Sequence, residues 1–265
     1  MDCTILIFSC DAYNDLWKPF FYFFHKHWRN CPYQIILATE SKNVNISDLD
    51  IHVIHTGSGE WSARALKAVQ QIDTKYLIVG LDDFFFYKDV DQEKLEQCIN
   101  WMESNSDVVN FSFAPTLWPD IDDGRFPGFE LRPEHAEYRV NLQMGLWRRD
   151  IFEGLLRKHE NVWQFEDFGT VRANRHKEWS FYAAEKKGPR VFTYDFGGAL
   201  WQGQWTFFAK QLLDENGFHI EYEKRGFNSQ SSSRQVDASP PPRLPLHKEL
   251  LRKAKRFLKN WRSYI

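Results

Sequence analysis

Two adjacent carboxylates, Asp82 and Asp83, follow the clearest predicted strand of the sequence, residues 76–81. At the end of a buried strand such carboxylates repel each other and lose solvation, so they are costly unless a cation or hydrogen-bond donors compensate them. Hard divalent ions such as Mg²⁺ and Mn²⁺ prefer carboxylate oxygens and bridge them to phosphates. The pair therefore predicts a metal site, although an acidic turn or a helix cap would explain it equally well.

A second acidic pair, Glu166 and Asp167, comes after the aromatic residues Trp163 and Phe165. Partial burial beside such rings would raise the pKa of a carboxyl group and suit it to take a proton from a hydroxyl. We favour Glu166 over Asp167 as this general base. The alternative is that both carboxylates only complement the dipole at the start of a helix.

The elements that must position these acids alternate through the first 115 residues. Short apolar runs predict strands, and amphipathic stretches with polar caps predict helices between them. The predicted strands are 4–9, 33–38, 51–55, 76–81 and 108–113, and the predicted helices are 16–28, 61–71 and 91–102. This alternation predicts an α/β fold with a mostly parallel central sheet flanked by helices. Ligands of such sheets bind at the carboxyl ends of the strands, where residues 9–11, 57–59 and the first acidic pair fall.

The rest of the chain is less regular. Residues 114–138 are rich in Pro, Asp and Gly and predict a long loop of the kind that often closes over a site. Helices at 149–158 and 166–175 and a strand at 190–194 follow. Residues 228–245 have the Ser, Gln and Pro content of a linker. Residues 246–265 predict a basic amphipathic helix, suited to contact with an anionic membrane surface or to packing on the domain.

Composition excludes several classes. A net charge of −2 argues against a protein that binds nucleic acid electrostatically. The four cysteines have neither a CxxC pair nor zinc spacing, and we expect reduced, buried thiols. The first apolar run is too short for a signal peptide, and no stretch is long enough to span a bilayer. We therefore expect a cytoplasmic protein.

Residues 57–83 (GSGEWSARALKAVQQIDTKYLIVGLDD) resemble the GT-A glycosyltransferases of the family 2 type. In that family a glycine turn and an Ala-Arg helix start precede an acidic motif, in the same order. Ala63-Arg64 matches the Ala-Arg pair, and the acidic motif here is Asp82-Asp83-Phe84 in place of a strict Asp-x-Asp. The resemblance implies a nucleotide-sugar donor and a bound Mg²⁺ or Mn²⁺. The residues it places on the donor are Ser9, Asp11, Tyr13, Arg64 and Asp82, and those on the metal are Asp83 and Asp82.

A second element is similar to bacterial transferases that build surface polysaccharides such as lipopolysaccharide and capsule. It consists of Gly145-Leu146-Trp147 followed by a Trp-x-x-Glu element, Trp163 to Glu166. The resemblance implies an inverting reaction on a hydroxyl of a lipid-linked or surface-polysaccharide acceptor. It places Gln143, Trp147 and Trp163 on the acceptor. It also implies one GT-A domain, 1–227, with a nucleotide-sugar-binding half (1–115) and an acceptor-binding half (116–227).

Two other classes stay open. A nucleotidyltransferase shares this sheet architecture, but it would need a loop rich in Gly and Lys after the first strand, which residues 9–13 do not supply. A non-catalytic glycan-binding subunit of a polysaccharide assembly would show aromatic stacking without dependence on a metal.

Overall fold

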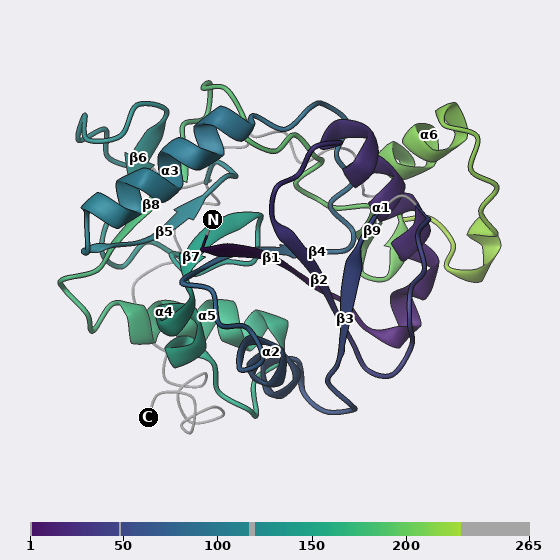
Figure 1. The fold of residues 1–265 in the computed structure, drawn as a ribbon, viewed down its shortest axis with the longest axis horizontal. Coiled ribbons are helices and arrows are strands. Elements are labelled where there is room, and N and C mark those ends of the chain that lie inside the picture. The colour runs from purple at the N-terminus through teal and green to yellow at the C-terminus, as the bar shows by residue number, and fades with distance from the viewer. Residues whose placement is uncertain (1, 48, 117–119, 229–265) are drawn as a thin grey trace, which may run out of the picture.

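The computed structural model describes residues 2–47, 49–116 and 120–228. Its centre is an eight-stranded sheet in the order β3-β2-β1-β4-β7-β5-β8-β6 (Figure 1). The strands are β1 (Cys3–Phe8), β2 (Gln34–Thr39), β3 (Ile51–His55), β4 (Tyr76–Leu81), β5 (Val108–Ser112), β6 (Phe129–Leu131), β7 (Gly145–Arg148) and β8 (Ser180–Ala184). A separate antiparallel ribbon joins β9 (Leu200–Trp201) to β10 (Gln204–Trp205).

Most neighbouring strands of the sheet are parallel. The block β3-β2-β1-β4 is parallel throughout, and β5 pairs with β8 in parallel. Strand β7 lies antiparallel between β4 and β5, and β6 is antiparallel at the edge. Strands β1 and β4 are buried along nearly their whole length, which explains why they are continuous apolar runs. The predicted α/β class with a mostly parallel sheet flanked by helices is confirmed.

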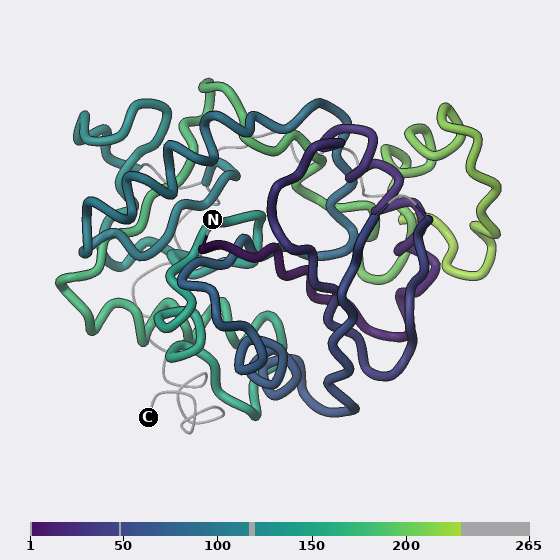
Figure 2. Tube along the Cα trace, in the orientation of Figure 1, coloured from purple at the N-terminus to yellow at the C-terminus, as the bar shows by residue number. Residues whose placement is uncertain are grey.

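Helices cover both faces of the sheet (Figures 1 and 2). One face carries α1 (Asn14–His27) and α3 (Gln92–Ser104), with α6 (Phe207–Glu215) beyond α1. The other face carries α2 (Trp61–Val69), α4 (Arg149–Leu155) and α5 (Val162–Ala173). Two short 3-10 helices, η1 (Asp11–Tyr13) and η2 (Tyr222–Lys224), complete the described elements.

The sheet therefore separates two hydrophobic cores. The core under α1 is aromatic, because Phe20, Phe21, Phe23 and Phe24 of that helix are all buried in it. The core under α2 and α5 contains smaller residues such as Ala65 and Ala68. Much of the high aromatic content of the sequence is thus used in packing.

Several element predictions need correction. Residues 190–194 form only an isolated bridge between Lys88 and Thr193. The predicted long loop 114–138 contains β6, and the sequence did not predict β7 or β8. Helix α5 begins at Val162, four residues earlier than predicted, because Asn161 and Gln164 form a reciprocal capping box.

The predicted linker 228–245, apart from Asn228, and the predicted basic helix 246–265 lie outside the described residues. Within the described ranges, no helix combines the length and apolarity needed to cross a membrane. All four cysteines are free thiols. Cys3 and Cys98 are buried as expected, whereas Cys10 and Cys31 are only half-buried.

Candidate functional site

Asp82 lies just beyond the end of β4, where that strand is paired with β1. Its side chain is buried, with 3% of the residue exposed. The Ser9 hydroxyl donates a hydrogen bond to its Oδ2, and the Trp17 indole N–H donates to the Ser9 hydroxyl over 2.6 Å. Burial, helped by the neighbouring charge of Asp83, raises the pKa of Asp82 to about 8. The carboxylate is therefore fixed in place but under-compensated when ionised.

Asp83 lies beneath a glycine turn. Burial raises its pKa to about 7, and its Oδ1 is buried without a hydrogen-bond partner among the residues that the structure describes. The backbone N–H of Ala199 donates to the Asp83 carbonyl over 2.7 Å. Gly198 has φ +75°, and a β-carbon there would lie 2.2 Å from Asp83 Oδ2. Only glycine fits this close approach of backbone and carboxylate.

The two acids fit the predicted divalent cation. They supply hard oxygen donors, one of them without any partner, in a setting where burial opposes their ionisation. In the part of the chain that the structure describes, no group of three or more His, Cys, Asp or Glu side chains could hold a metal. An ion held here would complete its shell with waters and ligand phosphates, as Mg²⁺ commonly does.

Arg64 joins the first three strands at their carboxyl ends. One amino group donates to the Ser9 carbonyl, and its Nε donates to Thr56 Oγ1 over 3.3 Å. Its other amino group lies 3.6 Å from Glu40 Oε1. Ser9, Glu40 and Thr56 follow β1, β2 and β3 respectively. Arg64 therefore links the three segments that follow β1, β2 and β3, and it stabilises this side of the site.

Asp11 faces away from the acidic pair toward residues 40–42. Its Oδ1 accepts hydrogen bonds from three successive backbone N–H groups at 3.1, 3.1 and 3.2 Å, and its Oδ2 accepts one from the Ser41 hydroxyl at 2.6 Å. Burial alone would raise its pKa, but these donors outweigh it and hold the pKa of Asp11 at about 2. The structure thus gives this predicted donor-binding residue a role in holding the loop after β2.

Tyr13 is half-buried beneath a basic side chain that sequence reasoning missed, Arg225. The guanidinium lies 4.8 Å from the centre of the Tyr13 ring. It also forms a two-pronged ion pair with Asp15, at 2.6 and 2.7 Å, and donates to the Ala12 carbonyl at 2.7 Å. No pattern in the sequence around Arg225 signals this placement, because its partners are more than 200 residues away.

Glu166 lies in the first half of α5, partly buried. The backbone N–H of Leu142 donates to its Oε1 over 2.9 Å. Burial, with a smaller contribution from Asp167, raises the pKa of Glu166 to about 7. Trp163 precedes it by three residues, so both lie on one side of the helix, and Trp163 is 73% exposed. These features are those of a general base beside an open aromatic surface.

The antiparallel strand β7 relates the two acidic groups. Because β7 runs against β4, the start of β7 adjoins the end of β4, and Gly145 pairs with Val79. Residues 142–144, which lead into β7, therefore lie near the acidic pair and also hold Glu166. The acidic pair Asp82-Asp83 and Glu166 therefore both lie near the carboxyl end of β4.

Tyr194, another residue that sequence reasoning missed, ties this edge together. Its hydroxyl accepts from the Met144 N–H at 3.0 Å and donates to Gln143 Oε1 at 3.1 Å. Its ring stacks on Phe84, the residue after Asp83, with centroids 4.6 Å apart. Gln143 is thus held by a ring that also packs against the residue after Asp83.

The prediction for Trp147 is wrong. This residue is the third of β7 and is 1% exposed, paired with Leu77 on one side and Asn110 on the other. Its ring packs against Phe152 and Phe181. Its indole offers no face to an acceptor, because the Gly-Leu-Trp element is a core strand.

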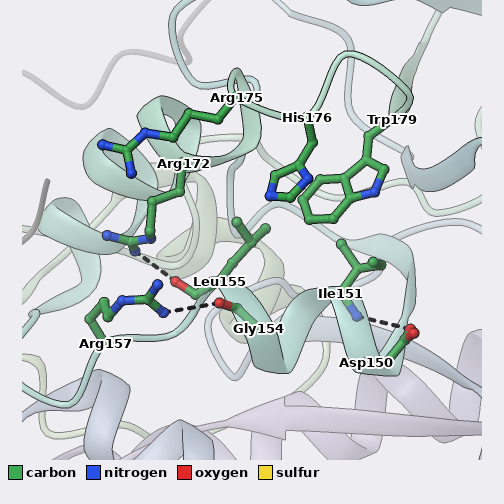
Figure 3. A pocket seen from close by; sticks show the side chains of 9 residues that line it. All are labelled: Asp150, Ile151, Gly154, Leu155, Arg157, Arg172, Arg175, His176 and Trp179. Carbon is green, nitrogen blue, oxygen red and sulfur yellow. Dashed lines mark hydrogen bonds between the residues drawn. The ribbon is translucent and has the colours of Figure 1, made fainter. Parts of the chain in front are cut away.

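A cavity of about 320 Å³ lies at the other end of α5 (Figure 3). None of the predicted site residues lines it. Two of its arginines have structural partners, because Arg172 pairs with the buried Glu160 and Arg157 donates to the Gly154 carbonyl. His176 and Trp179 line one side of the cavity, and their rings stack with centroids 3.7 Å apart.

The sequence matches no protein-family model and no curated protein. Several solved structures are similar to it over part of their length. Staphylococcus aureus TarS 1–349 in complex with UDP-GlcNAc is 13% identical with a TM-score of 0.43, over 72% of this chain and 60% of that one. A cytidylyltransferase from Leptospira borgpetersenii is 11% identical with a TM-score of 0.47, over 73% and 82%.

A third structure, 2-C-methyl-D-erythritol 4-phosphate cytidylyltransferase from Thermus thermophilus, is 8% identical with a TM-score of 0.42, over 73% and 92%. The chain spans about 60% of the length of the TarS 1–349 structures that it matches. At these identities and scores, the likenesses assign no activity to this chain.

Proposed function

We propose that this chain is a metal-dependent GT-A glycosyltransferase. It moves a sugar from a nucleotide-sugar donor to a hydroxyl of a lipid-linked or surface-polysaccharide acceptor, with inversion at the anomeric carbon. The observation that carries the proposal is the pair of acidic groups at one sheet edge. Asp82 and Asp83 suit a cation, and Glu166, held by the loop that enters β7, suits a base. The family resemblance of residues 57–83 and 145–166 supports the choice of reaction.

The nucleotide-sugar donor would bind at Asp82 and Asp83, whose neighbours hold the site in place. Asp83, with Asp82, would hold Mg²⁺ or Mn²⁺, which when bound neutralises the charge that develops on the departing diphosphate. Ser9 and Trp17 fix the Asp82 carboxylate, and Arg64 fixes the Ser9 backbone. These contacts pre-organise the site before any ligand enters.

The acceptor side supplies the proton transfer. Glu166 takes the proton from the acceptor hydroxyl, and the oxygen forms a bond to the anomeric carbon while the bond from that carbon to the diphosphate breaks. The nucleoside diphosphate leaves. Exposed Trp163 offers its ring to the acceptor sugar, and Gln143 is held in reach by Tyr194.

Incubation with candidate nucleotide sugars, an acceptor glycan and Mn²⁺ tests the proposal. We expect release of nucleoside diphosphate together with a new glycosidic bond of inverted configuration, detected by NMR, and loss of both on EDTA treatment. Asp83→Ala should abolish turnover. Unchanged diphosphate release in this variant would exclude the metal assignment.

Two further assays separate this proposal from the alternatives. A nucleotidyltransferase would release pyrophosphate from a nucleoside triphosphate and a sugar phosphate. A glycan-binding subunit would bind oligosaccharide in calorimetry with no response to UDP and Mn²⁺. The residues after β1 argue against the nucleotidyltransferase, because they supply a serine and an aspartate where that class would need glycine and lysine.

We also propose that residues 246–265, which lie outside the described residues, hold the enzyme on an anionic membrane surface. Their basic and aromatic composition supports this. Flotation with phosphatidylglycerol vesicles should recover the full chain but not a chain ending at residue 228. Equal recovery of both would contradict the proposal.

A further inference from the structure

A buried arginine, Arg132, lies directly after β6 and is 1% exposed. Its backbone N–H donates to the Phe181 carbonyl over 2.8 Å. Its guanidinium donates to three successive carbonyl oxygens, those of Glu137 at 3.0 Å, Tyr138, and Arg139 at 3.3 Å. We call these three bonds the Arg132 clamp. Burying a guanidinium costs solvation free energy, which the three bonds of the clamp offset.

The clamp holds a strained turn. His135 has φ 67° and Tyr138 has φ 54°, both in the left-handed region that side chains disfavour. Such conformations persist only where surrounding contacts over-determine them, and they concentrate at functional sites. The turn leaves the Tyr138 residue 51% exposed while its carbonyl is tied to the arginine beneath.

The segment that leaves the turn lies along α5. The Val140 N–H donates to Thr170 Oγ1 at 3.0 Å, and the Leu142 N–H donates to Glu166 Oε1 at 2.9 Å. Between these bonds the chain is close to the helix, because a β-carbon on Gly169 would lie 3.1 Å from Val140 Cγ1. A displacement of the turn would therefore pass directly to the N–H group that holds Glu166.

Charge links the same groups. The positive charge of Arg132 lowers the pKa of Glu166, whereas Asp167 on the same helix raises it. On its other side Arg132 faces Asp120, whose Oδ1 lies 3.9 Å from Nε, and Arg139 is a neighbouring cation. Burial and Asp167 therefore raise the pKa of Glu166, and Arg132 lowers it.

We propose that Arg132 is a positioning residue for the general base: its clamp fixes the turn that leads to Leu142, whose N–H orients Glu166. This inference rests on the proposed function. Arg132 itself touches no reacting atom.

The test follows the titration of the Glu166 carboxyl by ¹³C NMR together with the pH dependence of sugar transfer. In Arg132→Gln we expect the Glu166 titration and the alkaline rise of kcat both to move up by about one pH unit. The rate at neutral pH should fall about tenfold, with the donor KM unchanged. Arg132→Lys keeps the positive charge but cannot form all three bonds of the clamp. It should leave the pH of the Glu166 titration nearly unchanged and still lower kcat.

Arg139→Gln is the matched control. Arg139 is also buried, at 3% exposure, but it donates to Asn174 and to the Trp179 carbonyl and has no direct contact with the base. We expect no movement of the titration in this variant. If Arg132→Gln does not fold, Arg132→Lys carries the test, because it removes the three bonds of the clamp and keeps the charge; an unchanged kcat in that variant overturns the positioning role.

The outcomes separate the two proposals. A Glu166 titration that is the same in the original chain and in Arg132→Gln overturns the positioning role, even where transfer is intact. A shifted titration in a chain that transfers no sugar supports the coupling and overturns the proposed function. Equal shifts in the Arg132 and Arg139 variants would also overturn the positioning role, because the effect would then be general to buried arginines.

Discussion

Gly198 lies so close to Asp83 that a β-carbon on the glycine would come within 2.2 Å of the carboxylate Oδ2. The Gly198→Ala variant must therefore displace either the turn or the carboxylate. We expect the affinity for UDP and Mn²⁺, measured by calorimetry, to fall at least about tenfold. Gly217→Ala is the matched control, because it has the same φ of +75° and no atom within 4 Å of the added carbon. Gly217→Ala should lose about 1–2 kcal/mol of stability through its positive φ alone, and Gly198→Ala should lose more because of the added clash. Only Gly198→Ala should lose binding.

The Ser9 hydroxyl connects Trp17 to Asp82, so Ser9→Ala leaves an indole N–H and a carboxylate without their shared partner. We expect a loss of about 1–3 kcal/mol in the free energy of unfolding and weaker Mn²⁺ binding. Ser62→Ala provides the comparison, because the buried Ser62 hydroxyl has no hydrogen-bond partner. Urea unfolding should show almost no change in that variant. Equal losses in both would mean that the Ser9 hydrogen bonds contribute nothing.

Glu166 gives the reaction its expected pH dependence. A base must be ionised, and the pKa of Glu166 is raised to about 7 by burial, so the transfer rate should rise with pH and level off above about 7. Glu166→Gln should lower kcat by about 10²–10⁴-fold and remove this rise. Asp167→Asn should retain it. If Asp167→Asn removes the rise instead, Asp167 is the base.

The same residue predicts a stability effect of known sign. The pKa of Glu166 is higher in the folded chain than in the unfolded chain, because burial disfavours its charge. Its contribution to stability is therefore full below the unfolded pKa and is lost as the pH rises toward 7. Above that pH, Glu166→Gln should unfold at a higher temperature than the original chain. At pH 4 the two melting temperatures should be close, as measured by calorimetry.

Two tryptophans with similar predicted roles should behave differently. Trp163 is 73% exposed, so Trp163→Ala should change stability by less than about 0.5 kcal/mol while raising the KM for the acceptor. Trp147 is buried against Phe152 and Phe181, and Trp147→Ala should destabilise the fold by about 3–5 kcal/mol. A Trp163 variant with an unchanged acceptor KM would remove that residue from the acceptor site.

The sequence predicted the parallel half of the sheet well, because β1 and β4 are buried on both faces and their apolar runs are unambiguous. It also placed Asp82 and Asp83 correctly at a strand end. It did not predict β7, whose four residues are too short for a periodic signal and contain a tryptophan that suggested ligand stacking.

The long-range partners of the site were not predictable. Tyr194 and Arg225 act through contacts with distant segments, and nothing local to them indicates those contacts. Asp11 shows the converse limit. A carboxylate just after a strand suggested ligand binding, but the nearby loop donates four hydrogen bonds to it. Residue type and position indicate where polar groups gather, whereas tertiary contacts decide which of them stay available.

Strand β7 also determines how the chain can be divided. It belongs to the later half of the sequence, yet it is inserted between β4 and β5 of the earlier half. A chain cut after residue 115 would lack β7, and β4 and β5 would each lose a hydrogen-bonded neighbour in the middle of the sheet. We therefore expect the two halves to unfold as one cooperative unit. Exchanging one half with that of another protein would require a β7 that matches the foreign strands on both sides.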